Sequence, residues 1–198
     1  MPSAYKHNRQ ELIAQTAAAI IAESGLERVT IREIAAQCGV SKGVVEHHFA
    51  DKDDILRKTL DWVNQRFIAR EQRLTAKRTG LEAVRARLRC LLPLTTESVM
   101  EWKVRLHFWS FAVANADDQI GMSVRLAGAR ERFRTDVEQA IALGEVPATV
   151  DPLLAANMML HLTAGVACNM LVDSSYYNKA YRTRIVDKTI EDLRRGFI

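Results

Sequence analysis

The sequence predicts an all-α protein of about nine helices. Long stretches rich in Ala, Leu, Arg, Glu and Gln recur along its 198 residues, and no stretch alternates apolar and polar residues as a half-buried strand would. Only nine glycines and four prolines interrupt these stretches, and 48% of the residues are apolar. This composition provides enough apolar surface for a buried core and argues against disorder.

The first helix is expected from about residue 6 to residue 24. Its apolar residues recur every three to four positions, which places them on one face: Leu12, Ile13, Ala17, Ile20 and Ile21. Gly25 follows directly. Because glycine has no Cβ, it adopts the left-handed conformation of a helix end at the lowest cost, so the helix is expected to end there.

Two short helices follow, separated by a glycine turn. Thr30 and Glu33 have the spacing of a capping box, so the second helix begins after Thr30 and ends before Gly39. Its inward face carries Ile31, Ile34 and Ala35. Ser41 is a favourable N-cap for a third helix over about residues 42–49.

Six further helices are predicted from apolar periodicity and from the caps between them. They cover approximately residues 51–77, 80–93, 97–116, 118–143, 152–172 and 178–195. Asp51 caps the first of these helices, and Gly144 closes the fourth. Asp151 and Pro152 supply an N-cap and a preset first turn for the fifth.

Residues 30–52 together have the pattern of a helix-turn-helix unit. Gly39 permits the tight turn, Val40 fills the angle between the two helices, and Ser41 begins the second helix. In this geometry the second helix enters the major groove of duplex DNA, because that groove is wide enough to admit a helix.

The residues of this unit resemble the TetR family of bacterial regulators. The pattern of the family is matched by Gly25, Thr30, Ile34-Ala35, Gly39-Val40-Ser41-Lys42-Gly43, His48-Phe49 and Lys52. The resemblance covers the first quarter of the chain, and the total length and the all-helical remainder also suit the family. It implies a helix-turn-helix DNA-binding domain in residues 1–52 and a ligand-binding and dimerisation domain in residues 53–198.

The resemblance also implies which residues contact DNA. Thr30 and Lys52 would reach phosphates, residues 41–44 would face the groove, and His47 and His48 would contact the backbone or base edges. The complete expected set is Thr30, Arg32, Ser41, Lys42, Gly43, Val44, His47, His48 and Lys52. Alternatively, Thr30 and Ser41 act only as helix caps and the two histidines are ordinary surface residues. Adjacent histidines on a helix point about 100° apart, which argues against a shared metal site.

Bulk charge does not explain DNA binding by this segment. Residues 1–52 hold six Lys or Arg and six Asp or Glu, so affinity depends on where the basic residues lie: Lys6, Arg9, Arg32, Lys42 and Lys52. Glu46 stands where many family members have a tyrosine, and its carboxylate would repel phosphate, accept from a cytosine amine, or point away from the DNA. Residues 57–89 hold ten Lys or Arg against three acids, which indicates a solvated helix face or, alternatively, a source of long-range attraction for DNA.

The helix over residues 97–116 is rich in aromatic side chains. Trp102 and Trp109 fall on one face with Leu106, which indicates either core packing or the wall of a ligand pocket. The pocket hypothesis assigns Trp102, Arg105, Phe108, Trp109, Met158 and His161. The Trp-x6-Trp pattern is similar to the sensing domains of the glycine-betaine (BetI-like) branch of the family. That similarity implies an aromatic box for a quaternary ammonium ligand, bound through cation–π attraction.

The segment over residues 152–172 contains no Asp, Glu, Lys or Arg. Its length would span a bilayer, but polar residues such as Asn157 and His161 lower its hydrophobicity, and a helix buried inside a protein is the favoured interpretation. The family resemblance implies that this helix and the one over residues 178–195 form a four-helix dimer interface. A two-fold dimer predicts a palindromic operator with half-sites about 34 Å apart.

The favoured function is a repressor that leaves double-stranded DNA when an unknown small-molecule inducer binds. Three separated cysteines without a CxxC spacing argue against a disulfide framework or a zinc site, and residues 1–9 lack the apolar core of a signal peptide, so we expect a cytoplasmic protein. The family resemblance implies that it is a homodimer. We expect no cofactor and no membrane partner. An enzyme is an alternative that no phosphate loop, metal spacing or nucleophile–base pair supports. A further alternative is a TetR-like architectural DNA-binding protein without an inducer.

Overall fold

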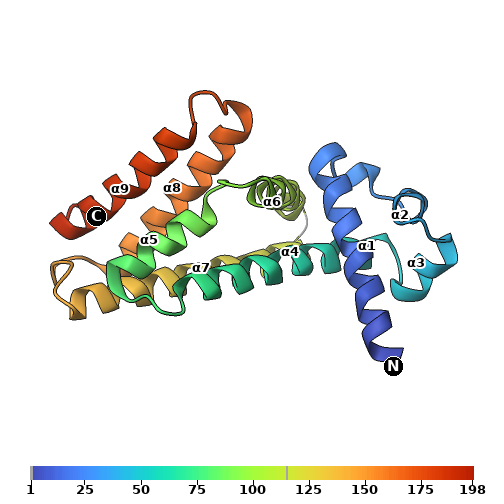
Figure 1. Ribbon diagram of the computed structural model, residues 1–198, viewed down its shortest axis with the longest axis horizontal. Coiled ribbons are helices and arrows are strands. Elements are labelled where there is room, and N and C mark those ends of the chain that lie inside the picture. The colour runs from blue at the N-terminus through green and yellow to red at the C-terminus, as the bar shows by residue number, and fades with distance from the viewer. Residues whose placement is uncertain (1, 115) are drawn as a thin grey trace. The chain divides into compact units, whose positions relative to one another are not determined.

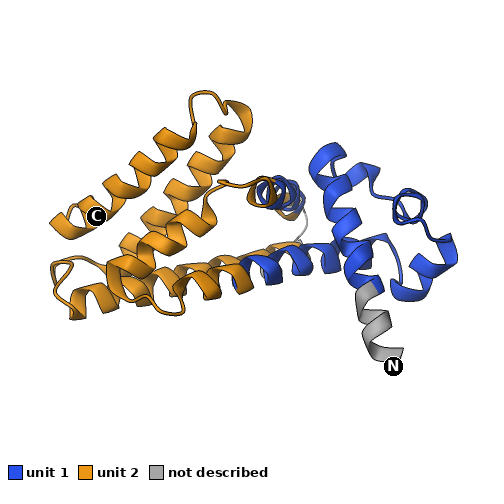
Figure 2. Cartoon of the chain, viewed as in Figure 1, with its two compact units in different colours: residues 1–68, 100–111 blue, residues 69–99, 112–198 orange. Residues whose placement is uncertain are grey.

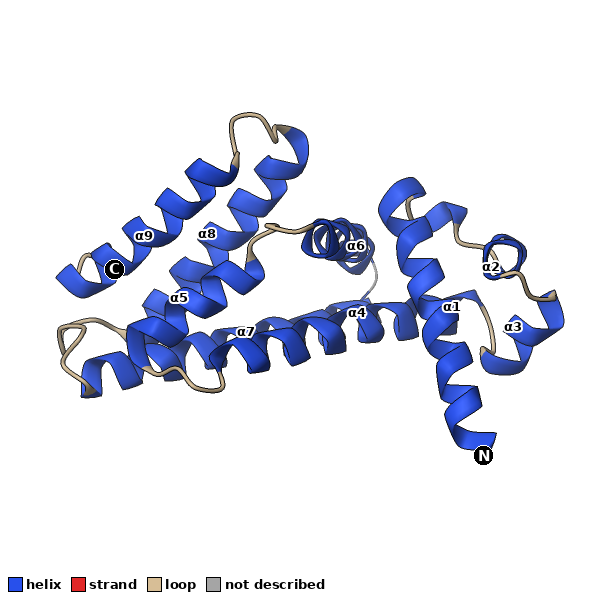
Figure 3. Cartoon of the chain, viewed as in Figure 1, coloured by secondary structure: helices blue, strands red, loops and turns tan. Residues whose placement is uncertain are grey.

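The computed structural model describes every residue except 1 and 115, and it describes no side chain at residues 2–8, 114, 116, 117 and 120. Within these limits the chain is helical and has no strand (Figures 1 and 3). The elements are α1 (Pro2–Ser24), the 3-10 helix η1 (Leu26–Arg28), α2 (Ile31–Cys38), α3 (Lys42–His48), α4 (Lys52–Thr75), α5 (Gly80–Leu91), α6 (Thr96–Ala114), α7 (Ala116–Ala142), α8 (Pro152–Val172) and α9 (Lys179–Arg195). The all-α prediction is confirmed.

Side-chain caps fix several helix starts where the sequence predicted them. The Thr30 hydroxyl accepts the Glu33 amide at 3.1 Å, and the Asp151 carboxylate accepts the Leu153 amide at 2.8 Å. Only half of the predicted capping box forms, because the Glu33 carboxylate accepts from the Gln37 side chain at 2.9 Å. The short helix η1 was not predicted, since three residues carry no detectable period.

The helices divide into two compact units, each of which is described by itself (Figure 2). Unit 1 comprises residues 1–68 and 100–111, and unit 2 comprises residues 69–99 and 112–198. The helices α4 and α6 contribute residues to both units. The start of α4 therefore packs with the helix-turn-helix, whereas the sequence placed the boundary between DNA-binding and sensing functions at residue 52. That functional boundary stays a prediction.

The core of unit 1 lies beneath the helix-turn-helix. Its buried side chains come from α1 to α4 and include Ile13, Ala17, Ile20, Ile21, Ile34, Val45, Phe49 and Ile55. Leu12 was predicted to face inward but is 37% exposed, because Ala14 and Ala18 complete the buried stripe of α1 in its place. Ile31, also predicted inward, is half-buried. Phe49 is buried as predicted, so it supports the short helix α3 from below.

In unit 2, α7 packs against α5 and α8, and α9 packs against α5. The apolar core includes Leu88, Leu92, Phe133, Val137, Met159, Ile190 and Leu193. A buried ion cluster lies beside it: Arg87 contacts Glu71 at 3.0 Å and Asp136 at 2.7 Å, and Arg132 contacts Glu71 at 2.5 Å. Burial alone would lower the pKa of Arg87, but hydrogen bonding and charge from Asp136 and Glu71 raise it above its ordinary value. This cluster ties α5 to α7 and to the end of α4.

Candidate functional site

The bend between α2 and α3 is built around Gly39. This residue has φ 65° and ψ 33°, a left-handed conformation that glycine adopts without strain. The Val40 amide donates to the Ala35 carbonyl at 3.0 Å, which closes the end of α2 and turns the chain toward α3. Val40 itself is half-buried, while Val45 is fully buried beneath α3. The geometry is that of a helix-turn-helix.

The predicted DNA-contacting residues of α3 gather on one solvent-exposed surface. Ser41, Lys42, Gly43 and His47 are exposed, and Val44 and His48 are half-buried. Ser41 occupies the N-cap position, but its hydroxyl makes no capping hydrogen bond, so the capping role predicted for this side chain is wrong. Thr30, which precedes α2, and Arg32, within α2, are also exposed. Lys52 is half-buried.

Glu46 forms an ion pair within this surface. Its Oε1 lies 3.0 Å from Lys42 Nζ, one helical turn away, and both side chains are exposed. The carboxylate that the sequence showed in place of a tyrosine therefore partly neutralises the most prominent cation of α3. Exposed pairs of this kind add little stability, so the pairing bears on DNA contact more than on folding.

A shallow hollow of about 430 Å³ lies beside α3. Its walls come from the turn, from one face of α3 and from α1: Arg9, Gly39, Val40, Ser41, Gly43, Val44, His47 and His48. Arg9 thus borders the predicted DNA-contacting residues from a separate helix. Lys6, the other basic residue expected to contribute from this end of the chain, lies outside the described side chains.

The start of α4 is held by its own acidic residues. Asp51 Oδ1 accepts the Asp54 amide at 2.7 Å, and Asp54 Oδ2 accepts the Ala50 amide at 3.1 Å and Lys58 Nζ at 2.9 Å. Burial acts to raise the pKa of Asp54, but these bonds from Lys58 and Ala50 outweigh it, so the pKa lies below its ordinary value. The charged Asp54 therefore fixes the turn that carries Lys52.

Unit 1 also contains the aromatic cluster predicted from α6. Trp102 and Phe108 are buried, and the rings of Trp102 and Trp109 meet edge to face with centroids 5.9 Å apart. Arg105, predicted as a polar group of a ligand pocket, lies over two aromatic rings instead of projecting into open space. Its guanidinium carbon is 4.6 Å from the centre of the Phe67 ring and 5.5 Å from that of Trp102.

A contact between α6 and the end of α1 was not predicted. Gly25 has φ 82°, and a Cβ at this position would lie 3.3 Å from Cε1 of the His107 ring. The sequence indicated a helix end at Gly25, but the partner 82 positions away has no local signal. His107 thus packs closely against the turn that precedes the helix-turn-helix.

The two remaining residues assigned to the ligand pocket, Met158 and His161, belong to unit 2. Both lie on the outer face of α8, and Met158 is 43% exposed. Their assignment to a pocket wall stays a prediction. They belong to an exposed stripe of α8, called here the α8 stripe, which consists of Leu154, Met158, His161, Gly165, Asn169 and Val172.

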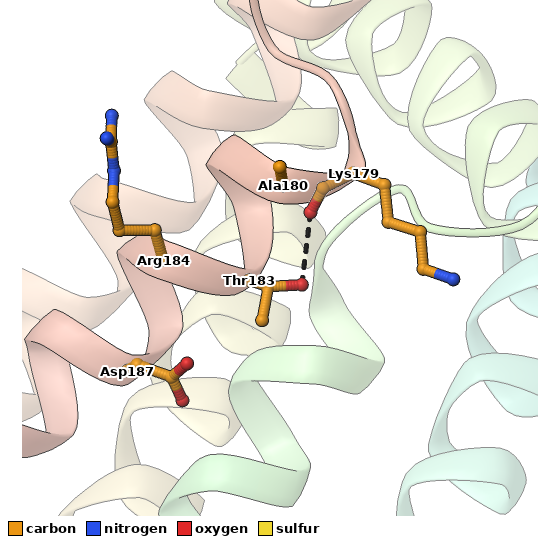
Figure 4. Close-up of a pocket in the computed structure, with 5 residues that line it drawn as sticks. All are labelled: Lys179, Ala180, Thr183, Arg184 and Asp187. Carbon is orange, nitrogen blue, oxygen red and sulfur yellow. Dashed lines mark hydrogen bonds between the residues drawn. The ribbon is translucent and has the colours of Figure 1, made fainter.

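The neighbouring helix α9 presents a second exposed face (Figure 4). A shallow hollow of about 660 Å³ is lined there by Lys179, Ala180, Thr183, Arg184 and Asp187. The Thr183 hydroxyl donates to the Lys179 carbonyl at 3.0 Å, and Asp187 pairs with Arg85 of α5. Four of its five lining residues are polar or charged, in contrast to the α8 stripe.

Models of two known families match this chain. The model of bacterial regulatory proteins of the tetR family matches residues 13–59, and the model of the C-terminal part of BetI-type transcriptional repressors matches residues 80–195. The chain belongs to the TetR family. Its C-terminal part, more than half of the chain, is of the BetI type. Both resemblances inferred from the sequence are confirmed.

Curated relatives of this TetR-family chain are transcription regulators. The repressor KstR2 of Mycobacterium tuberculosis is 40% identical over 65 residues, which are 31% of this chain and 32% of that protein. The regulator BetI of Burkholderia mallei is 35% identical over 106 residues, or 52% and 53% of the two chains. The chain thus spans about a third of KstR2 and about half of BetI. PksA of Bacillus subtilis is 22% identical over 195 residues, 98% of this chain and 94% of its own.

Solved structures share the fold of this TetR-family chain. A transcriptional regulator from Rhodococcus sp. Rha1 has a TM-score of 0.81 at 24% identity, and covers 94% of this chain and 96% of its own. A regulator from Saccharomonospora viridis, solved in complex with choline, has a TM-score of 0.86 at 20% identity, with coverage of 93% and 96%. At these identities the likeness establishes the fold alone. The fold and the relatives are those of regulators and not of enzymes.

Among the described residues, one helix, α8, is sufficiently long and apolar to cross a membrane, judged by length and composition only. Its most apolar stretch is 39% buried within the chain. A helix that packs inside a soluble protein or in a subunit interface meets the same criteria.

Proposed function

We propose that this chain is a cytoplasmic, dimeric repressor that binds a palindromic operator and leaves it when a small molecule binds. The observation that carries the proposal is the exposed surface of α3 behind a rigid glycine bend, in a chain that belongs to the TetR family. The roles of individual residues follow from that surface. Lys42 and Ser41 meet the groove or its phosphates, and Arg32, Thr30 and Lys52 fix the position of the unit on the backbone.

The dimer is proposed to form through α8 and α9. The α8 stripe contains no Asp, Glu, Lys or Arg, and Gly165 within it allows close approach of a second helix. The exposed polar face of α9 (Figure 4) would form the rim of the same interface. Two-fold symmetry then places two α3 helices about one DNA turn apart, roughly 34 Å.

The ligand is proposed to bind at the aromatic residues of unit 1. Buried Trp102 and Phe108, with Trp109 beside them, supply the aromatic faces that attract an organic cation. The choline complex of the Saccharomonospora viridis regulator, which has the same fold, favours a ligand of that chemical class. A ligand changes DNA affinity only if it binds the two conformations of the dimer unequally. A coupling of about 1–3 kcal/mol would be typical.

The proposal is tested by DNA binding at several salt concentrations. Wild-type protein and the Lys42→Ala variant are titrated against labelled DNA from upstream of the gene, with fluorescence anisotropy as the signal. We expect specific binding by the wild type and weaker binding by the variant. The slope of log affinity against log salt should become flatter by about one unit, because one phosphate contact is lost.

The matched control is Lys103→Ala, which removes an exposed lysine of α6 that lies away from α3. It should leave both affinity and slope close to the wild-type values. Absence of specific binding to any upstream fragment would contradict the proposed function. An unchanged slope for Lys42→Ala would contradict only the role assigned to Lys42.

A further inference from the structure

The aromatic cluster of unit 1 already holds a cation of its own chain. The guanidinium of Arg105 lies over the rings of Phe67 and Trp102, at 4.6 Å and 5.5 Å from their centres. Both rings are buried, with exposed fractions of 5% and 2%, and the Arg105 side chain is 11% exposed. A guanidinium over buried aromatic faces gains both cation–π attraction and stacking, more so where water is largely excluded.

A carboxylate completes the arrangement. Oε2 of Glu101 lies 4.0 Å from Nη2 of Arg105, and Glu101 is 1% exposed. A carboxylate this deeply buried is strongly unfavourable unless a positive charge lies near it. Two aromatic faces and one buried carboxylate form the kind of surroundings that bind an organic monocation, and Arg105 supplies that cation from within the chain.

We propose that Arg105 is the resident cation of this site, and that an organic monocation can bind there only by taking the place of its guanidinium. The chemical class is set by what the site already accommodates, an organic monocation with a head group about the size of guanidinium. An anion would face the Glu101 carboxylate, and a neutral ligand would gain no electrostatic attraction from that carboxylate or from the two aromatic faces.

The consequence for regulation rests on the function proposed above. Phe67 belongs to α4, whereas Trp102 and Arg105 belong to α6, so the resident guanidinium joins the two helices within unit 1. α4 is also the helix that begins at Lys52, next to α3. A ligand that displaced Arg105 would remove this contact between α4 and α6. The contact that replaced it would be lost when the ligand dissociates.

The test is chemical rescue of the Arg105→Ala variant, with guanidinium chloride as the probe. The variant removes a cation that lies over two aromatic faces and beside the buried Glu101 carboxylate, and we expect a Tm about 3–6 °C below that of the wild type. Guanidinium chloride at about 20 mM, far below denaturing concentrations, should raise the Tm of the variant by about 1–2 °C relative to equal sodium chloride. The same addition should not raise the Tm of the wild type, because Arg105 already fills the site.

Two variants keep the test decisive. Arg105→Lys retains a point charge on a flexible stem and should lie between wild type and Arg105→Ala in Tm, without rescue by guanidinium. Phe67→Leu combined with Arg105→Ala removes one aromatic face, and its rescue should fall to less than half. Equal Tm values for Arg105→Ala in guanidinium and sodium chloride, or a wild-type Tm for Arg105→Ala, would overturn the proposal.

DNA binding gives a second and separate measurement. Arg105→Ala should bind operator DNA at least about threefold more weakly than wild type, and guanidinium should recover part of that loss relative to sodium chloride. The Tm measurement requires no DNA. If the wild type bound no DNA at all, the proposed function would fail while the rescue of Tm would still decide whether Arg105 is the resident cation.

Discussion

At the scale of single residues, the ion pair between Glu46 and Lys42 determines how much positive charge α3 presents to DNA. The two groups are 3.0 Å apart and both are exposed, so the pair contributes only about 0.3–0.5 kcal/mol to stability. A carboxylate on this surface also repels every phosphate that approaches. On the proposed DNA-contacting surface, Glu46 would therefore lower the affinity for non-specific DNA. Its carboxylate would also be able to accept a hydrogen bond from a cytosine amine, which would favour particular sequences.

Replacing Glu46 by alanine should raise affinity for non-specific duplex DNA by about threefold or more at low salt, because a negative charge is removed and Lys42 is released. Glu46→Gln, which keeps the shape and removes the charge, should give the same direction. Anisotropy titrations against unrelated duplexes at two salt concentrations measure the effect, and Tm should stay within about 1 °C. A fall in non-specific affinity for both variants would show that the carboxylate does not face the DNA.

The sequence predicted the contacts of residues whose partners lie close along the chain. Thr30 and Asp151 cap helices as expected, since each accepts an amide two or three residues away. Arg105 was placed in the aromatic cluster, but its ring partner Phe67 was not predicted, because Phe67 lies 38 positions earlier on another helix. The assignment of Met158 and His161 to a pocket stays a prediction, because the sequence of an apolar helix does not reveal which of its faces the rest of the chain covers.

At the scale of elements, the start of α4 depends on an ionised side chain. Asp54 accepts from the Ala50 amide and from Lys58, and the same helix start carries Lys52. The pKa of Asp54 is lower in the folded chain than in the unfolded chain, so the folded state favours the ionised form. That stabilisation is present above the ordinary pKa of 3.8 and is lost as the pH falls through the lowered value.

Asp54→Asn should therefore lower the free energy of unfolding by about 1 kcal/mol at pH 7, and the deficit should shrink as the pH falls below about 4. Urea unfolding followed by circular dichroism at pH 7, 5 and 3.5 measures the difference. Asp53→Asn is the matched control, because Asp53 is exposed in the same helical turn and should have a smaller effect. A deficit for Asp54→Asn that stayed constant with pH would count against the ionised carboxylate as the cause.

At the scale of the whole molecule, the α8 stripe is an exposed helix face whose apolar side chains are not buried within a single chain. No Asp, Glu, Lys or Arg occurs in residues 152–172, yet Leu154 is 55% exposed and Val172 is 90% exposed. Contiguous apolar surface of this kind on a soluble chain marks an interaction site. Membership of the TetR family makes a second copy of the chain the natural partner, and a two-fold dimer also requires each face to complement itself.

A charge placed on the α8 stripe should therefore separate the dimer without unfolding the chain. We expect Met158→Glu to weaken dimerisation by about tenfold or more, because each interface would have to bury two carboxylates near the symmetry axis. Val124→Glu is the matched control, since Val124 is an exposed apolar residue of α7 that does not belong to the α8 stripe. Light scattering after size-exclusion chromatography gives the mass at several protein concentrations, and circular dichroism tests whether each variant remains folded.

The folded monomeric variant should also lose its preference for a palindromic duplex over a single half-site, because one recognition helix gains nothing from the second half-site. A Met158→Glu protein that stayed dimeric at the lowest concentration would place the interface elsewhere on the chain.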